Sequence, residues 1–312
     1  MNNQVSGSVH PISDSKCIII LSEKSSGSSV CQDLLATFAD VKRVAKTRHY
    51  QNETLYWTKA ASVLERPQIR MLDSEVPISP GRARKDLVNL LNDNLQTYSP
   101  PDDDRELIFD GWRLLCEAHR PIFLEKSPHH LVQWSAIELI LEFMKMNPGI
   151  DFLFVGLVRN PMATIYSQFN RWKTRPEALQ RQWITAYKNL LRLKNKVGEK
   201  VVIVRYEDIA LSLSPLQPVF DFCNVRNDAV DRNFIHKRSI SKWKNDKWFG
   251  FALGAEAMEL AYEYGYRTED LLNPNSNYRL WPAYREIGRA GYKIRLLARG
   301  MVRKTFTMPN DD

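Results

Sequence analysis

The sequence predicts an α/β fold in which a central parallel sheet is flanked by helices. Three apolar runs support this prediction: residues 17–21, residues 152–158, and the first part of residues 200–209, a segment that ends in polar residues. The apolar residues in them are consecutive rather than alternating, which is typical of strands buried on both faces of a parallel sheet. Segments with apolar residues at helical spacing separate the runs. The 312 residues, 44% of them hydrophobic, are enough for one large domain or two small ones.

The first predicted strand runs directly into a small polar loop, Lys-Ser-Ser-Gly-Ser-Ser at residues 24–29. Residues 30–38 then have the apolar spacing of a helix. Free N–H groups in the first turn of such a helix, together with its dipole, favour an anion. Gly27 allows the backbone to approach a phosphate, Lys24 adds a positive charge, and the serine hydroxyls are donors. The order differs from a Walker A motif because the lysine precedes the glycine. An ordinary strand–turn–helix remains an alternative.

The next segment, residues 48–57, mixes titratable and aromatic side chains just before a predicted helix at 55–64. Glu53 in this segment is either a functional carboxylate or an exposed helix-start residue that interacts with the dipole. Three prolines in residues 65–80 predict an irregular loop. Leucines at helical spacing predict an amphipathic helix at residues 82–97.

A short apolar run at residues 122–124 ends in a polar cluster that contains Lys126 and His129. A helix is predicted to follow at residues 131–145, so the cluster lies at the carboxyl end of a strand. Ligands bind at this edge in doubly wound sheets. We predict no metal site here, because adjacent histidines point in different directions on a helix. The acidic run at residues 102–104 has no partner acid at useful spacing and is predicted to be a solvated loop.

The strand at residues 152–158 ends in Arg159, and Pro161 is well placed to begin a helix. Ser167 lies two turns into that helix. A guanidinium from the strand end and a hydroxyl from the helix are able to bind one phosphate between them. Arginine at a strand end is also a common surface residue. A further helix is predicted at residues 179–196, before the third strand.

The last third of the chain is basic. Residues 236–245 form a basic loop, and a helix at 251–264 is predicted to end at Gly265. Residues 279–304 carry eight Arg or Lys residues and one acid, Glu286. Two interpretations of this tail remain open. One is a basic amphipathic helix for a membrane surface or an anionic partner. The other, more common, is a helix packed on the domain with a solvated basic side.

We divide the chain into a flexible N-terminus at residues 1–15, one catalytic domain at 16–275 and a basic, helical C-terminal extension at 276–312. The net charge of +8 predicts an anionic ligand or surface. No zinc-finger spacing, RNA-binding signature or basic zipper is present, so we expect no nucleic-acid partner. Scattered cysteines, a polar N-terminus and no apolar run of about eighteen residues predict a cytoplasmic protein.

Four of these segments occur in the same order in one protein family. The chain resembles the sulfotransferases that use 3′-phosphoadenosine 5′-phosphosulfate (PAPS) as donor, which implies their P-loop NTPase-like fold. Residues 24–29 look like the family's 5′-phosphosulfate loop, and 159–167 looks like its 3′-phosphate motif. Residues 204–208 resemble the strand end that follows. Residues 237–245 resemble the late basic loop that covers the cofactor.

The chain departs from the common family pattern at its first motif. Gly27 follows Lys24 by three residues, as in a variant form of the loop, and Glu23 replaces the usual proline. An acid beside an anion site is unfavourable, so we expect the Glu23 side chain to face away. The resemblance extends from residue 17 to about residue 250.

The resemblance implies a role for each site residue. Lys24 contacts the leaving oxygen of the phosphosulfate, and the loop surrounds the 5′-phosphate. Arg159 and Ser167 hold the 3′-phosphate, and Tyr206 contacts the cofactor near its adenine. The full set of predicted cofactor-binding residues is Lys24, Ser25, Ser26, Gly27, Ser28, Ser29, Arg159, Ser167, Tyr206, Lys237, Arg238 and Ser239.

Sulfuryl transfer to a hydroxyl also needs a base. Glu53 is the first candidate, because carbohydrate-type members of the family place a glutamate base in this region. His129 is the second, because Lys126-Ser127-Pro128-His129 parallels the segment in which cytosolic members place a histidine base. Lys126 stabilises the sulfuryl oxygens in either case. The predicted catalytic residues are therefore Lys24, Glu53, Lys126 and His129, and cations of the protein take the place of a metal.

Two other functions remain as alternatives. A P-loop-type kinase shares the strand–loop–helix but needs Lys-Ser or Lys-Thr after the glycine and an acid for Mg²⁺. A non-catalytic protein that retains the fold and contacts a membrane peripherally is suggested by the basic tail. For the sulfotransferase we expect a hydroxyl acceptor, which is a small molecule, a carbohydrate or a lipid.

Overall fold

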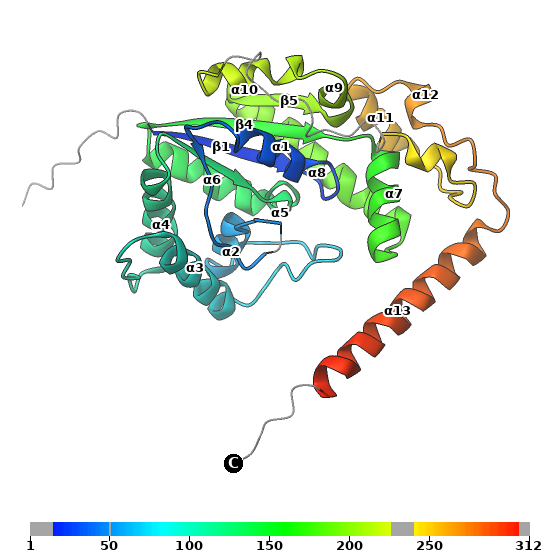
Figure 1. Cartoon of the computed structure of the whole chain (residues 1–312), viewed down its shortest axis with the longest axis horizontal. Helices are drawn as coiled ribbons and strands as arrows, with labels where there is room; N and C mark the ends of the chain where they lie inside the picture. Colours follow the sequence, from blue (N-terminus) through cyan, green and yellow to red (C-terminus); the bar gives the residue numbers. More distant parts are fainter. Residues whose placement is uncertain (1–14, 50, 226–239, 306–312) are drawn as a thin grey trace, which may run out of the picture.

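The computed structural model describes residues 15–49, 51–225 and 240–305. Five parallel strands form one sheet in the order β2-β3-β1-β4-β5. The strands are β1 (Ser15–Ser22), β2 (Val41–Lys42), β3 (Ile122–Lys126), β4 (Ile150–Val158) and β5 (Val201–Arg205). The strand that precedes the polar loop, β1, therefore lies at the centre of the sheet (Figure 1). The predicted α/β fold with a central parallel sheet is confirmed.

The sheet register brings the predicted motifs to one edge. Ile20 of β1 is level with Lys126 at the end of β3 and with Val155 of β4. Val158, the last residue of β4, is level with Arg205 at the end of β5. Because all the strands are parallel, the segments that follow β1, β3, β4 and β5 leave the sheet from the same side.

Helices cover both faces of the sheet (Figure 1). Alternate residues of β1 serve the two faces: Ile19 packs in a core with Trp57 of α2, and Ile18 packs in a second core with Leu34 of α1. The helices are α1 (Ser28–Leu35), α2 (Tyr56–Val63), α3 (Pro80–Asn94), α4 (Asp104–Ala118), α5 (Pro128–Val132), α6 (Trp134–Met146), α7 (Pro161–Trp172), α8 (Pro176–Val197), α9 (Tyr206–Leu211), α10 (Gln217–Phe222), α11 (Ala255–Glu263), α12 (Thr268–Leu271) and α13 (Trp281–Thr305).

Several element boundaries differ from the prediction for local reasons. The helix predicted at 131–145 is two helices, because α5 begins at Pro128 and the extended backbone of Gln133 separates it from α6. The strand predicted at 200–209 ends at Arg205, and α9 begins at the next residue. The helices α4 and α10 also pack on the sheet, and the short strand β2 extends it beside β3. The helix α4 begins where the Asp103 side chain accepts a hydrogen bond from the Glu106 N–H at 2.8 Å. The acidic run at 102–104 thus caps a helix.

The predicted loop at residues 65–80 contains no helix or strand before Pro80. All four cysteines are buried free thiols. Among the helices that the structure describes, none is both long enough and apolar enough to cross a membrane.

Candidate functional site

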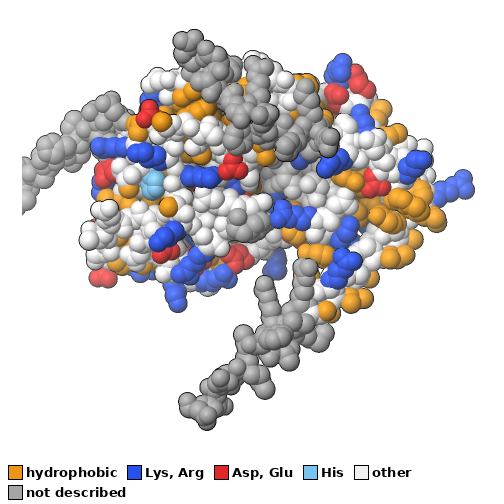
Figure 2. Space-filling model, in the orientation of Figure 1, with side chains coloured by type: hydrophobic (Ala, Val, Ile, Leu, Met, Phe, Trp, Pro, Cys, Tyr) orange, Lys and Arg blue, Asp and Glu red, His pale blue; other side chains and the backbone are white. Residues whose placement is uncertain are grey.

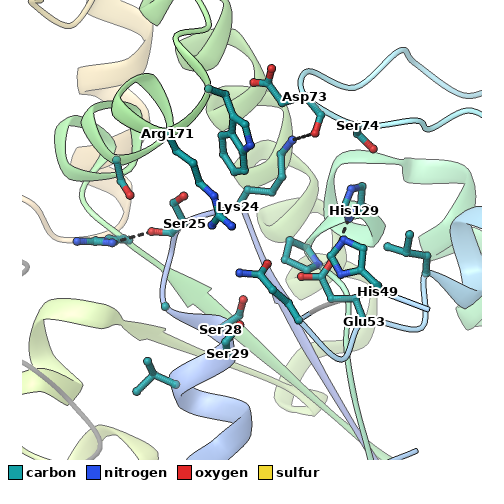
Figure 3. A pocket seen from close by; sticks show the side chains of 18 of the residues that line it. Lys24, Ser25, Ser28, Ser29, His49, Glu53, Asp73, Ser74, His129 and Arg171 are labelled. Atoms are coloured by element: carbon teal, nitrogen blue, oxygen red, sulfur yellow. Dashed lines mark hydrogen bonds and ion pairs between the residues drawn. The ribbon is translucent and has the colours of Figure 1, made fainter. Parts of the chain in front are cut away.

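A pocket of about 680 Å³ opens at the carboxyl edge of the sheet. Its lining comes from segments that are far apart in the chain: the loop after β1, the segment at residues 49–55, the loop at 73–75, the start of α5, and α7. The loop serines Ser25, Ser28 and Ser29 lie on one side of this pocket, and His49, Glu53 and His129 lie together on the other (Figure 3). Lys24 and Arg171 lie between the two sides.

The β1–α1 loop is shaped by a glycine that no other residue type replaces easily. Gly27 has a φ of 91°, and a Cβ atom built on it would lie 2.3 Å from Cδ2 of Tyr206. The guanidinium of Arg159 lies over the same tyrosine ring, 4.8 Å from its centroid. Arg159 also donates from Nη1 to the Ser25 carbonyl at 2.7 Å. The loop, Tyr206 and Arg159 therefore form one packed unit.

Gly27→Ala is expected to displace Tyr206, because the new methyl group overlaps the ring and the backbone conformation is left-handed. Such overlap and strain cost about 1–3 kcal/mol. Thermal unfolding should show a lower Tm, and binding of adenosine 3′,5′-bisphosphate should weaken. Gly81→Ala is the matched control, because a Cβ at Gly81 has no neighbour within 4 Å. Equal Tm values for the two variants would contradict the packing described here.

The serines of the loop do not all face the pocket. Ser25, Ser28 and Ser29 line it. Ser26 is fully buried instead, and its hydroxyl lies 3.0 Å from the Tyr187 hydroxyl. The predicted contact of Ser26 with a cofactor is therefore restricted to its backbone.

Glu23 is buried beneath the loop, as expected for an acid next to an anion site. Its Oε1 accepts hydrogen bonds from Gln168 at 3.1 Å and Gln182 at 2.7 Å. Burial raises the pKa of Glu23, although the adjacent Lys24 charge and the two amides oppose this. Glu23 is absent from the pocket lining, so the expectation that it faces away is confirmed.

Lys24 is 7% exposed and crosses the pocket toward the 73–75 loop (Figure 3). Its Nζ donates to the carbonyl of Leu72 and, at 3.4 Å, to that of Asp73. The ammonium also lies over the Trp172 ring, 5.1 Å from its centroid. Burial lowers the pKa of Lys24, and the neighbouring acids, Glu23 first, oppose the shift.

Glu53 is the centre of the opposite side of the pocket. Its Oε1 accepts from Lys126 Nζ at 3.0 Å. Its Oε2 lies 3.5 Å from Nδ1 of His49 and 3.5 Å from Nδ1 of His129. Burial raises the pKa of Glu53, but the contact with His129 and the Lys126 charge outweigh it and bring that pKa to about 2. The carboxylate is therefore ionised.

The surroundings of His129 favour the neutral form of its imidazole. Burial lowers its pKa below the usual value, and the contact with Glu53 opposes the shift only in part. Since Nδ1 faces a carboxylate, the proton of the neutral ring is assigned to Nδ1, which leaves Nε2 as the basic atom. The pKa of His49 is lowered in the same way.

A model described as the sulfotransferase family matches residues 17–229, more than half of the chain. The chain belongs to the sulfotransferase family. No curated protein matches its sequence.

Two of the solved structures that share this fold are sulfotransferase domains. One is the sulfotransferase domain of the Synechococcus PCC 7002 olefin synthase, with a TM-score of 0.54 and 18% identity over 85% of this chain and 99% of that one. Another is the sulfotransferase domain of the curacin biosynthetic pathway, with a TM-score of 0.51 and 18% identity over 80% of this chain and 97% of that one. At this identity the likeness shows the sulfotransferase fold.

Hydrogen bonds between two distant segments of this sulfotransferase hold Glu53 beside His129. The Thr54 hydroxyl donates to Glu125 at 2.8 Å, and the Leu55 N–H donates to the Ser127 hydroxyl at 3.0 Å. The second of the adjacent histidines, His130, is fully buried and accepts from the Trp57 N–H at 3.2 Å. The two adjacent histidines therefore have different positions: His129 lines the pocket, and His130 holds the segment that carries Glu53.

The pocket also contains residues that the sequence reasoning did not assign to the site. His49 shares Oε2 of Glu53 with His129, and its position four residues before Glu53 was the available signal. Arg171 and Trp172 come from the end of α7, and Asp73 comes from the proline-rich loop. No sequence pattern marks these three as neighbours of β1.

The predicted residues Ser167 and Tyr206 line the pocket, while Lys126 lies behind it, fully buried, and donates to the Ser29 hydroxyl at 3.2 Å. The predicted cofactor residues Lys237, Arg238 and Ser239 lie outside the described residues. Within the described ranges, no group of three or more His, Cys, Asp or Glu side chains is arranged to hold a metal ion.

Proposed function

We propose that this sulfotransferase moves the sulfuryl group of PAPS to an acceptor hydroxyl. The observation that carries the proposal is the two-sided pocket. A cationic, hydroxyl-rich loop forms one side, and a carboxylate with two imidazoles forms the other (Figure 3). Transfer between two oxygens needs both sides, because the donor must be held at one and the acceptor deprotonated at the other.

The residues present fit the proposed donor. Gly27 leaves no Cβ between the loop and Tyr206, and α1 begins at the loop, so its first N–H groups are available to bind a phosphate there. We assign Arg159 and Ser167 to the 3′-phosphate, and Tyr206 to a contact near the adenine. The 5′-phosphosulfate is assigned to Lys24, Ser25, Ser28, Ser29 and the loop backbone. Lys237, Arg238 and Ser239 remain proposed as a covering basic segment.

When bound, PAPS supplies a sulfuryl group on a phosphate leaving oxygen. In the proposed reaction the S–O bond to that phosphate breaks, an S–O bond to the acceptor oxygen forms, and the acceptor proton passes to a base. The products are a sulfate ester and adenosine 3′,5′-bisphosphate. Lys24 supplies positive charge next to the transferred group, and Lys126 adds to it from behind the pocket wall, so the proposal includes no metal.

The charges around Glu53 favour His129 as the base that takes the proton directly from the acceptor hydroxyl. A carboxylate with a pKa of about 2 is a weak base. The neutral imidazole of His129 accepts a proton on Nε2 more readily, and Glu53, 3.5 Å from Nδ1, stabilises the imidazolium that forms. We therefore propose a Glu53–His129 pair in which His129 takes the proton. Direct proton transfer to Glu53 is the alternative that the kinetics below distinguish.

The acceptor is proposed to be a hydroxyl of a small molecule, a carbohydrate or a lipid. We propose the cytoplasm as the location, since all four cysteines are free thiols, which suits a reducing compartment.

Calorimetry tests the donor assignment. Adenosine 3′,5′-bisphosphate is expected to bind without metal and more tightly than ATP with Mg²⁺. Arg159→Ala should weaken that binding by about 2–3 kcal/mol, the scale of a hydrogen bond to a charged group. Arg113→Ala is the control, because Arg113 on α4 pairs with Glu117 at 2.7 Å and is not among the lining residues. Preference for ATP with Mg²⁺ would replace the proposal with a kinase, and an unchanged affinity in Arg159→Ala would refute the 3′-phosphate assignment.

A further inference from the structure

The C-terminal helix α13 exposes its apolar side to solvent. Ile287, Ile294 and Leu297 lie on one side of a helix with 3.6 residues per turn and are 72%, 66% and 66% exposed. Figure 1 shows α13 extending away from the sheet, and Figure 2 shows apolar side chains along its outer side. A surface helix of a globular protein normally turns such a side toward the core.

The side of α13 that contacts the domain carries Trp281, which is buried against Phe169 and Phe249, together with Arg285. Arg285 Nη1 pairs with Glu177 of α8 at 2.6 Å, and its side chain is only 20% exposed. A Cβ built on Gly288 would lie 3.9 Å from Cδ of Lys173, at the end of α7. The turns of α13 that touch the domain therefore bury Trp281 together with Arg285, and the side chains of Ile287, Ile294 and Leu297 remain exposed.

An aromatic cluster continues the apolar side beyond the helix. Trp248 is 53% exposed and stacks on Tyr284, with 5.8 Å between the ring centroids. Tyr278 meets the same tryptophan edge-on at 5.3 Å. Aromatic rings with a polar edge are enriched where protein meets the membrane–water interface.

The charge of this segment selects among occupants for the apolar side. Residues 279–304 carry eight Arg or Lys residues and one acid. A second copy of α13 would place two strongly cationic helices together, so like-charge repulsion opposes a dimer through this side. An anionic surface is attracted by the same charges, and a lipid bilayer also accepts an apolar side along a whole helix.

We propose that α13 lies in the surface of an anionic lipid bilayer. Ile287, Ile294 and Leu297 enter the acyl boundary, and cations such as Lys293 and Arg295 reach the lipid phosphates. None of these residues lines the pocket. The surface is therefore separate from the proposed sulfuryl-transfer site, and its test does not depend on that site.

Flotation of the full chain with vesicles tests the proposal. The protein is expected to float with phosphatidylcholine vesicles that contain phosphatidylglycerol and to stay in solution with phosphatidylcholine alone. Ile294→Ser with Leu297→Ser should weaken binding on the order of a hundredfold, since two apolar side chains lose their burial. Lys293→Gln with Arg295→Gln should weaken it about fivefold per charge, and added salt should have the same effect.

The matched control is Leu211→Ser with Met146→Ser, two apolar side chains that are 67% and 57% exposed on other elements. This variant should float like the wild type, and Tm should be unchanged in all the variants. Failure of the wild type to float with anionic vesicles would overturn the proposal and leave an acidic protein as the partner. A dimer that Ile294→Ser with Leu297→Ser converts to a monomer without lipid would assign the surface to a second copy.

Discussion

Replacing His129 with Asn is expected to lower kcat by about 10²–10⁴-fold, the usual contribution of a positioned base. Glu53→Gln should lower kcat as well, because the imidazolium formed on His129 loses the carboxylate 3.5 Å from its Nδ1. Both variants should still bind adenosine 3′,5′-bisphosphate, since the loop serines and Arg159 lie on the other side of the pocket. Steady-state kinetics with calorimetry on the same samples separates the two effects.

The pH profile identifies which group takes the proton. Burial lowers the pKa of His129, and the base must be neutral to act, so kcat should fall only as pH drops below the ordinary histidine range. The Glu53 charge raises that pKa in the wild type. In Glu53→Gln, the pH below which the residual activity falls should therefore be lower than in the wild type. A wild-type rate that stays flat through and well below this range would instead make Glu53 the base.

A histidine outside the pocket serves as control for both variants. His119 lies after α4 and its Nδ1 is 2.8 Å from the Leu115 carbonyl oxygen. His119→Asn should leave kcat and its pH profile unchanged. Full activity in His129→Asn would exclude His129 as the base and leave Glu53, for a flat pH profile, or His49, whose Nδ1 is equally far from Glu53, for a profile that still falls.

Replacing Lys24 with Ala is expected to lower kcat by about 10²–10³-fold, because a preorganised charge near the leaving oxygen is lost. The ammonium is held in place by the Leu72 and Asp73 carbonyls and by the Trp172 ring. Single-turnover kinetics with saturating PAPS measures the step itself.

Lys16→Ala is a control on the same strand. Lys16 lies near the other end of β1 and donates to the Phe222 carbonyl at 2.7 Å, away from the pocket. It should change stability slightly and kcat not at all. If Lys24→Ala lowered affinity for adenosine 3′,5′-bisphosphate with no change in kcat, Lys24 would be a binding residue that does not act on the leaving group.

The sequence alone determined the strands of the sheet and the edge at which its polar motifs meet. Unbroken apolar runs mark buried parallel strands because both faces of each strand must be covered, and the runs before Lys24, Lys126 and Arg159 are confirmed as β1, β3 and β4. Parallel strands end at one edge, so three distant polar motifs were predicted to meet there. The composition of the 24–29 loop, with its glycine, was enough to predict an anion site.

Only the tertiary structure decided which side chains at that edge face the pocket and which are buried behind it. Local spacing does not show that Ser26 turns inward to Tyr187 or that Lys126 is buried against Glu53. Nor does it show that α13 turns Trp281 and Arg285 toward the domain and leaves its other large apolar side chains exposed. These arrangements depend on contacts between residues far apart in the chain. A buried polar or charged group needs a partner, and the partners within reach are decided by how the elements pack.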